Sequence, residues 1–163
     1  MRWIVWMIAG LAVVVLIVAV VGALIPKAHA ASRTARVSLP PDALFAVLSD
    51  VDRYPSWRGD VKSVQRLPDQ DGKPAWVEAA GGMEIPLHFE RMERPSLLVA
   101  RIGPGLAFGG TWTYQIAPAP GGSDLTITEN GEIYNVIFRF MARFVLGYHA
   151  TMDGFLKNLQ ARR

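Results

Sequence analysis

The stretch NVIFRFMARFVLGYHATMDGFLKNL, residues 135–159, decides the fold. Its apolar residues recur at spacings of three and four, which place them on one stripe of a helix with 3.6 residues per turn. A stripe this long and aromatic needs a large apolar partner. We therefore expect one long helix, in which residues 147–159 face a sheet and residues 136–146 carry surplus apolar surface. The stripe consists of Ile137, Met141, Phe144, Tyr148, Met152, Phe155 and Leu159.

The sheet is expected from the residues that precede this helix. Short alternating segments with strand-like composition are separated by turn residues, and Gly81-Gly82 is a hairpin signal. Gly131 interrupts the last segment and predicts a bulge or bend. The short turns favour an antiparallel meander that curls around the final helix and leaves space for a ligand. The expected strands are residues 32–39, 61–67, 75–80, 83–92, 97–102, 111–117 and 125–134.

A short helix and a turn-rich piece are expected between the first two strands. Pro41 and Asp42 suit the first turn of a helix, because proline is tolerated there and a carboxylate favours the positive end of the helix dipole. Residues 50–57 are rich in turn formers, and Pro55 is expected to prevent a helix there.

The N-terminal residues predict one transmembrane helix. Residues 3–25 hold no charge, and 23 residues at 1.5 Å each span the hydrocarbon core of a bilayer. A cleaved signal peptide is the alternative, because residues 28–30 read Ala-His-Ala; the length of the apolar run favours a retained anchor. The chain then divides into an anchor (1–27), a connector (28–32) and a folded domain (33–160). The flanking Lys and Arg residues favour a single-pass protein with its domain in the cytoplasm.

Composition excludes several classes of function. The chain has 163 residues and no cysteine, so disulfides, thiolate nucleophiles and cysteine-ligated metals are ruled out. The chain has a net charge of +3, and its basic residues are scattered along the sequence. Nucleic-acid binding requires clustered basic residues, so no nucleic-acid partner is expected.

Four blocks of sequence resemble the START-like, or SRPBCC, superfamily of helix-grip domains, which includes polyketide cyclase/dehydrase-like and lipid-transport proteins. The resemblance covers residues 33–160 and rests on residues 40–50, 54–57, 108–114 and 126–131. It implies an α+β fold with about seven antiparallel strands wrapped round a long C-terminal helix. It also implies an apolar cavity between the sheet and the helix, and a lipid- or quinone-like ligand. In this chain the expected membrane anchor precedes the domain in the sequence.

The residues do not reveal a reaction. His29, His88 and His149 lack the ligand spacing of a metal site, so neither a metal nor a cofactor is expected. Glu129 is the best candidate for an acid or base, followed by Glu78; a carboxylate paired with arginine, or one at the rim of the sheet, is the simpler interpretation of each. We therefore expect ligand binding or transfer without catalysis, with no catalytic residue. A cyclase/dehydratase-type enzyme is the alternative.

The ligand cavity is expected to be lined by aromatic and methionine side chains together with one carboxylate. The glycine-rich residues 103–108 are expected to form a gate over it. An accessory subunit of a membrane complex, bound through residues 138–146, is a further alternative. Arg139 and Arg143 share a face there, as solvated residues or as part of an interfacial helix. The expected lining is Trp57, Trp76, Phe89, Phe108, Trp112, Tyr114, Glu129, Phe138, Met141, Tyr148, Met152 and Phe155.

Overall fold

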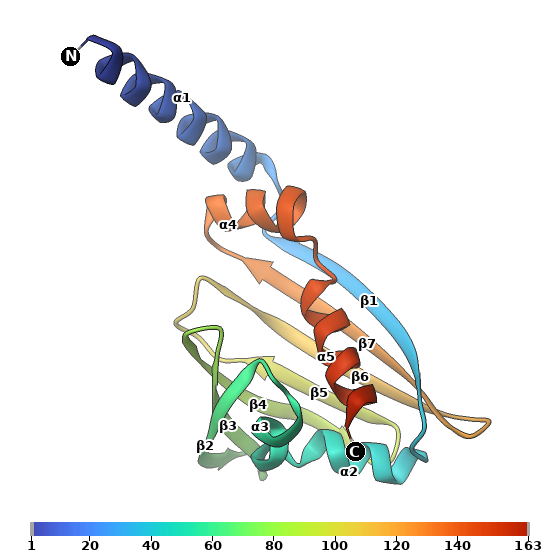
Figure 1. The fold of residues 1–163 in the computed structure, drawn as a ribbon. Coiled ribbons are helices and arrows are strands. Elements are labelled where there is room, and N and C mark those ends of the chain that lie inside the picture. The colour runs from blue at the N-terminus through green and yellow to red at the C-terminus, as the bar shows by residue number, and fades with distance from the viewer. Residues whose placement is uncertain (1, 163) are drawn as a thin grey trace.

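A seven-stranded antiparallel sheet forms the body of the protein (Figure 1). The computed structural model describes residues 2–162. The spatial order β1-β7-β6-β5-β4-β3-β2 means that six strands follow one another as hairpins, while the first strand pairs with the last. The predicted α+β helix-grip architecture is confirmed. The strands are β1 (Ala28–Val37), β2 (Val61–Gln70), β3 (Lys73–Ala80), β4 (Met83–Glu93), β5 (Leu97–Ile102), β6 (Phe108–Ala119) and β7 (Gly122–Ile133).

Three short helices connect β1 to β2. Helix α2 (Pro41–Ser49) begins with Pro41 and buries Leu44, Phe45 and Leu48 against the sheet. The 3₁₀ turn η1 (Val51–Arg53) and the single turn α3 (Tyr54–Trp57) follow. The expectation that Pro55 prevents a helix was wrong, because Pro55 lies in the first turn of α3, where its missing N–H has no helical partner to lose.

The predicted long C-terminal helix is broken in two. Helix α4 (Val136–Met141) runs into a π-helical turn, η2 (Ala142–Leu146), and helix α5 (Ala150–Ala161) follows after a break. The side chain of Asn135 caps α4 by accepting hydrogen bonds from the backbone N–H groups of Ile137 and Phe138. Gly147 ends η2 with φ of 75°, a conformation that glycine adopts readily and other residues avoid.

Helix α5 is the helix that the sheet grips. Its buried residues are Met152, Phe155, Leu156 and Leu159, which repeat at helical spacing and join the hydrophobic core with residues of the sheet. This agrees with the expectation that residues 147–159 pack on the sheet. The apolar stripe itself continues into α4, so the break at Gly147 redirects a stripe that the sequence presents as continuous.

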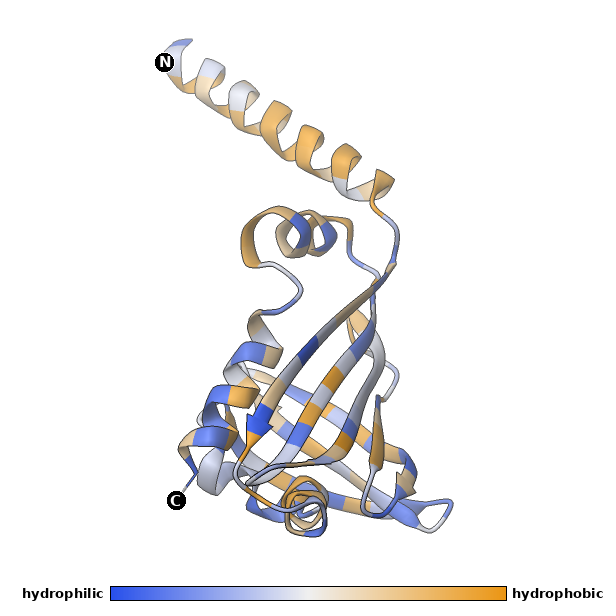
Figure 2. Cartoon of the chain, turned by 90° about the vertical axis from the view of Figure 1, so that its right-hand side faces the viewer, coloured by the Kyte–Doolittle hydropathy of each residue, from blue (hydrophilic) through white to orange (hydrophobic). Residues whose placement is uncertain are grey.

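Helix α1 (Arg2–Leu24) is long, apolar and exposed, and it packs only at its C-terminal end (Figure 2). A side chain at Gly22 would overlap the backbone of Val136, so glycine permits a close approach of α1 to α4. Arg139 Nη1 donates a hydrogen bond of 2.7 Å to the carbonyl oxygen of Ile25. The expectation that Arg139 and Arg143 are both solvated was therefore wrong for Arg139, which is buried.

The expected connector, residues 28–32, is instead the first half of β1. These residues pair with residues 128–132 of β7 in continuous register. Only residues 25–27 therefore separate α1 from the sheet.

Candidate functional site

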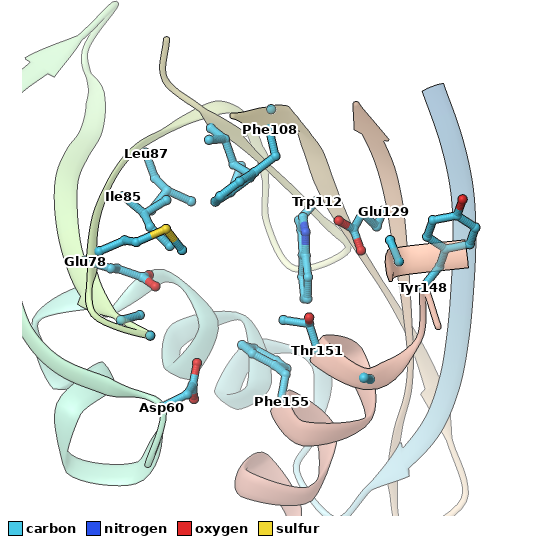
Figure 3. Close-up of a pocket in the computed structure, with 18 of the residues that line it drawn as sticks. Asp60, Glu78, Ile85, Leu87, Phe108, Trp112, Glu129, Tyr148, Thr151 and Phe155 are labelled. Carbon is cyan, nitrogen blue, oxygen red and sulfur yellow. The ribbon is translucent and has the colours of Figure 1, made fainter. Parts of the chain in front are cut away.

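A cavity of about 630 Å³ lies between the concave face of the sheet and the C-terminal helices (Figure 3). Its walls are mainly apolar: Ile85 and Leu87 come from β4, Ala100 and Ile102 from β5, and Trp112 from β6. Alternate residues of a strand point to the same face, which is why these strands each contribute residues two apart. The cavity has the size and character of sites for small hydrophobic molecules.

Nine of the twelve side chains expected to line a cavity lie on its wall. They come from β3, β6, β7, α4, the break after η2 and α5, so the fold brings together segments that are far apart in the sequence. Of the expected gate, residues 103–108, Phe108 lies on the wall. The nine are Trp76, Phe108, Trp112, Tyr114, Glu129, Phe138, Met141, Tyr148 and Phe155.

The other three, Trp57, Phe89 and Met152, lie outside the cavity wall. Phe89 and Met152 are buried in the packed core, where the Phe89 ring lies 4.8 Å from that of Trp76. Trp57 packs edge-on against Phe155, with ring centroids 5.4 Å apart. Apolar periodicity identifies the buried face of an element, but it does not separate residues that border empty volume from those that fill it.

One pole of the cavity holds a self-contained charge cluster around Arg58. Its Nη1 lies 3.1 Å from the carboxylate of Glu78, and its Nη2 donates a 2.7 Å hydrogen bond to Asp60. Trp76 Nε1 donates a 2.9 Å bond to the same Glu78 oxygen. The guanidinium also lies over the rings of Tyr54 and Phe155, at 5.0 and 5.3 Å from the ring centroids.

The charges of this cluster satisfy one another. Burial disfavours the charged guanidinium, but the two carboxylates outweigh that effect and hold the pKa of Arg58 above its usual value. Glu78 is only 4% exposed, and Arg58 and Trp76 are its hydrogen-bond partners in this buried position. The interpretation of a carboxylate paired with arginine thus describes Glu78.

The opposite pole contains Glu129 and His29, and its polar groups are incompletely paired. Glu129 Oε1 lies 3.9 Å from His29 Nε2, beyond hydrogen-bond distance. Burial raises the pKa of Glu129, and the side chain of Trp112 opposes only part of that shift. Burial also lowers the pKa of His29. Both shifts favour the neutral forms, a carboxylic acid that donates and an imidazole that accepts.

His29 is held in place by its neighbours on both sides. Its ring stacks on Tyr148, with centroids 4.2 Å apart and planes 17° from parallel. On the other side, a side chain at Gly131 would overlap the imidazole ring. A bulge or a bend was expected at Gly131; the bulge is not present, because the pairing of β7 with β1 and β6 runs through this residue without a shift. The glycine makes room for His29 instead.

The polar wall residues that were not expected to line the cavity include His29, Arg58 and Asp60. His29 was placed in a connector, and its proximity to Glu129 arises from pairing between β1 and β7, which no local spacing encodes. His88 pairs with Arg101 across β4 and β5, and His149 forms the N-cap of α5. Within residues 2–162, no group of three or more His, Asp or Glu side chains is placed to hold a metal ion.

Comparison with known proteins identifies relatives at the level of the fold. Residues 28–162 match the family described as polyketide cyclase/dehydrase and lipid transport. No curated protein matches the chain.

The structural relatives include proteins described as aromatase/cyclases. The di-domain aromatase/cyclase StfQ from the steffimycin pathway is 15% identical with a TM-score of 0.65; the match covers 83% of this chain and 50% of StfQ, so this chain spans half of that protein. The Zhui aromatase/cyclase from Streptomyces sp. R1128 is 14% identical, with a TM-score of 0.66 over 82% of this chain and 92% of that one. A START superfamily protein from Mycobacterium smegmatis is 16% identical, with a TM-score of 0.63 over 82% and 96%. At these identities the likeness concerns the fold alone.

Proposed function

The chain belongs to the polyketide cyclase/dehydrase and lipid transport family, and from that premise we propose that it binds a neutral, hydrophobic small molecule, lipid- or quinone-like, in the cavity while α1 holds it at a membrane. The observation that carries the proposal is the 630 Å³ apolar cavity between the sheet and the C-terminal helices. Each methylene group that such a cavity removes from water contributes about 0.8 kcal/mol to binding.

The charges at the two poles support a neutral ligand. Arg58, the cation at one pole, is already engaged by Glu78 and Asp60. At the other pole, the carboxylate of Glu132 lies on the wall and would repel a carboxylate or a phosphate. A carbonyl or hydroxyl group suits Glu129 and His29, because it can exchange hydrogen bonds with them without bringing a charge into the cavity.

The packing at the end of α1 supports a retained anchor. Cleavage after Ala30 would remove three residues of β1 that pair with residues 130–132 of β7. It would also remove His29 from its stack on Tyr148 and the carbonyl of Ile25 from buried Arg139. Leaving a buried arginine without this partner is costly, so the domain is better suited to an intact N-terminus. The flanking basic residues favour the cytoplasmic side for the domain.

Ligand binding can be tested with the full-length chain in detergent. Native mass spectrometry of protein extracted from membranes should detect a bound neutral lipid or quinone. Titration with n-decyl benzoquinone should give saturable quenching of tryptophan fluorescence, and decanoate of matched chain length should bind at least about tenfold more weakly.

A matched pair of variants locates the binding site. Ala100→Phe fills the cavity and should weaken quinone binding by about tenfold or more. Val99→Phe adds the same ring to the opposite face of β5, which does not line the cavity, and should leave binding unchanged. A chain that carries no ligand and shows no saturable binding of the quinone would refute the proposed function.

A cyclase- or dehydratase-type reaction is a second candidate, favoured by the raised pKa of Glu129 beside His29 on the cavity wall. A buried carboxylic acid of this kind can act as a general acid. Glu129→Gln should then abolish turnover of a polyketide-like substrate. Turnover equal to that of the unsubstituted chain would remove Glu129 from the reaction.

A further inference from the structure

Exposed apolar side chains of the folded domain gather at the end nearest α1. Within residues 25–162, the large apolar side chains classed as exposed are confined to the tip of the β3–β4 hairpin and to the stretch from the end of β7 to η2. Five of them lie on α4 and η2, which we call the roof segment, residues 136–146. These five are Ile137, Phe138, Phe144, Val145 and Leu146, with 42–65% of each residue exposed.

The roof segment is fixed directly beside α1. Gly22 brings the last turns of α1 against Val136, and Arg139 binds the carbonyl oxygen of Ile25. Figures 1 and 2 show α4 and η2 beneath the C-terminal end of α1, between α1 and the main body of the sheet. The exposed apolar surface of the roof segment is therefore continuous with that of α1.

The same segment also forms one wall of the cavity. Phe138, Met141 and Leu146 line it, while Phe144 and Val145 do not and are exposed. One side of the roof segment thus contacts the cavity and the other lies open. Gly147, with its positive φ, is the link between this segment and α5.

Charged residues border this apolar surface on two sides. Lys27 lies in the short link between α1 and β1, and Arg143 lies on η2 with its guanidinium 5.8 Å from the centroid of the Phe144 ring. Both side chains are exposed, whereas Arg139 is buried. Aromatic and aliphatic side chains with lysine or arginine at their edge are the pattern of a helix that lies in the headgroup region of a bilayer.

We propose that the roof segment inserts into the bilayer interface beside α1, so that the cavity opens toward the acyl chains. This inference rests on the proposed function, because the segment would then be the route by which an apolar ligand enters. The partner is a lipid surface rather than a protein, because the patch adjoins an apolar helix of 23 residues and shares its exposure. A ligand that enters here need not cross water.

The insertion can be measured with a single label, because the chain has no cysteine. Val145→Cys and Lys157→Cys, each in the full-length chain, place a nitrobenzoxadiazole fluorophore on η2 or on the exposed face of α5. In nanodiscs of phosphatidylcholine and phosphatidylglycerol, doxyl-labelled lipid should quench the label at residue 145 at least about threefold more than the label at residue 157. Equal quenching at the two sites would overturn the proposal. That result is also the one expected if the patch binds a protein partner instead of lipid.

A functional arm separates this inference from ligand binding itself. Phe144→Asp with Val145→Asp should slow quinone transfer from vesicles about tenfold, because two carboxylates oppose insertion. Affinity in detergent should stay unchanged, since neither residue lines the cavity. Gln65→Asp with Gln70→Asp on β2 adds the same charge far from α1 and should not slow transfer. Unslowed transfer in the first variant would overturn the inference, while absent binding in detergent would refute the proposed function instead.

Discussion

Two glutamates on the wall of one cavity, Glu78 and Glu129, have opposite surroundings. The carboxylate of Glu78 accepts hydrogen bonds from Arg58 Nη1, at 3.1 Å, and from Trp76 Nε1, at 2.9 Å. Glu129 has His29 at 3.9 Å, and burial raises its pKa. The role of a buried carboxylate therefore depends on which hydrogen-bond donors and charges the neighbouring elements supply. One pole of the cavity is closed by its own charges, and the other retains groups that a ligand can engage.

The largest expected effect comes from breaking the closed pole. Glu78→Ala removes a partner of Arg58, whose side chain is only 11% exposed, and should lower the free energy of unfolding by about 3 kcal/mol, because a largely desolvated charge loses its compensation. Urea denaturation in detergent micelles, followed by tryptophan fluorescence, measures it. Glu84→Ala on the exposed end of β4 is the control and should change it by less than about 0.5 kcal/mol. If Glu78→Ala lowered the free energy of unfolding no more than Glu84→Ala does, Asp60 alone would be enough to compensate the charge of Arg58.

A change at Gly131 disturbs the open pole without altering an ionisable group. Gly131→Ala forces the imidazole of His29 away from its stack on Tyr148 and should cost about 1–2 kcal/mol of stability. Gly154→Ala is the matched control of opposite sign. It lies in the middle of α5 with open space around it, and alanine there should stabilise the protein by about 0.5–1 kcal/mol. The same urea titration compares the two variants. An unchanged free energy of unfolding in Gly131→Ala would mean that His29 moves without loss of stability.

A smaller effect is expected at the rim of the closed pole. Asp60 bonds to Arg58, but its side chain is 46% exposed, so water screens the pair. Asp60→Asn should therefore lower the free energy of unfolding by no more than about 1 kcal/mol, as judged from the urea midpoint at constant slope. A loss as large as that of Glu78→Ala would make Asp60, rather than Glu78, the principal partner.

The smallest expected effect is a change in how stability depends on pH. The pKa of Glu129 is raised above its usual value of 4.5, so the folded state holds this proton more tightly than the unfolded state. The resulting stabilisation is fully present below pH 4.5 and is lost as pH rises through the folded-state pKa. Glu129→Gln should abolish this loss and leave the protein more stable than the unsubstituted chain at neutral pH. Thermal unfolding across pH 4–8 measures it, and identical pH profiles would contradict the raised pKa.

The fold was predictable wherever a local pattern decided it. The spacing of Met152, Phe155 and Leu159 identified the gripped helix, and Gly81-Gly82 identified the β3–β4 hairpin. The break at Gly147 was missed because the apolar stripe continues through it. The early start of β1 at Ala28 was missed because its partner, β7, is distant in the sequence.

The candidate site was less predictable than the fold, for a related reason. Trp112 and Phe155 follow from strand alternation and helix periodicity, which identify the face that points inward. Nothing in that pattern distinguishes Phe155, on the cavity wall, from Met152, in the core one turn away. The pairing of Arg58 with Glu78, and the position of His29 beside Glu129, arise from tertiary contacts between separate elements.

The pairing of the first strand with the last has a consequence for the order of events during synthesis. Ser32 on β1 bonds to Ile127 on β7, 95 residues later. At a ribosomal rate of 5–20 residues per second, roughly 5–20 s pass between the two. During that interval α1 is complete, while β1 beside it has an unpaired edge. A ribosome that stalls before β7 would hold a chain with its full apolar helix and no cavity.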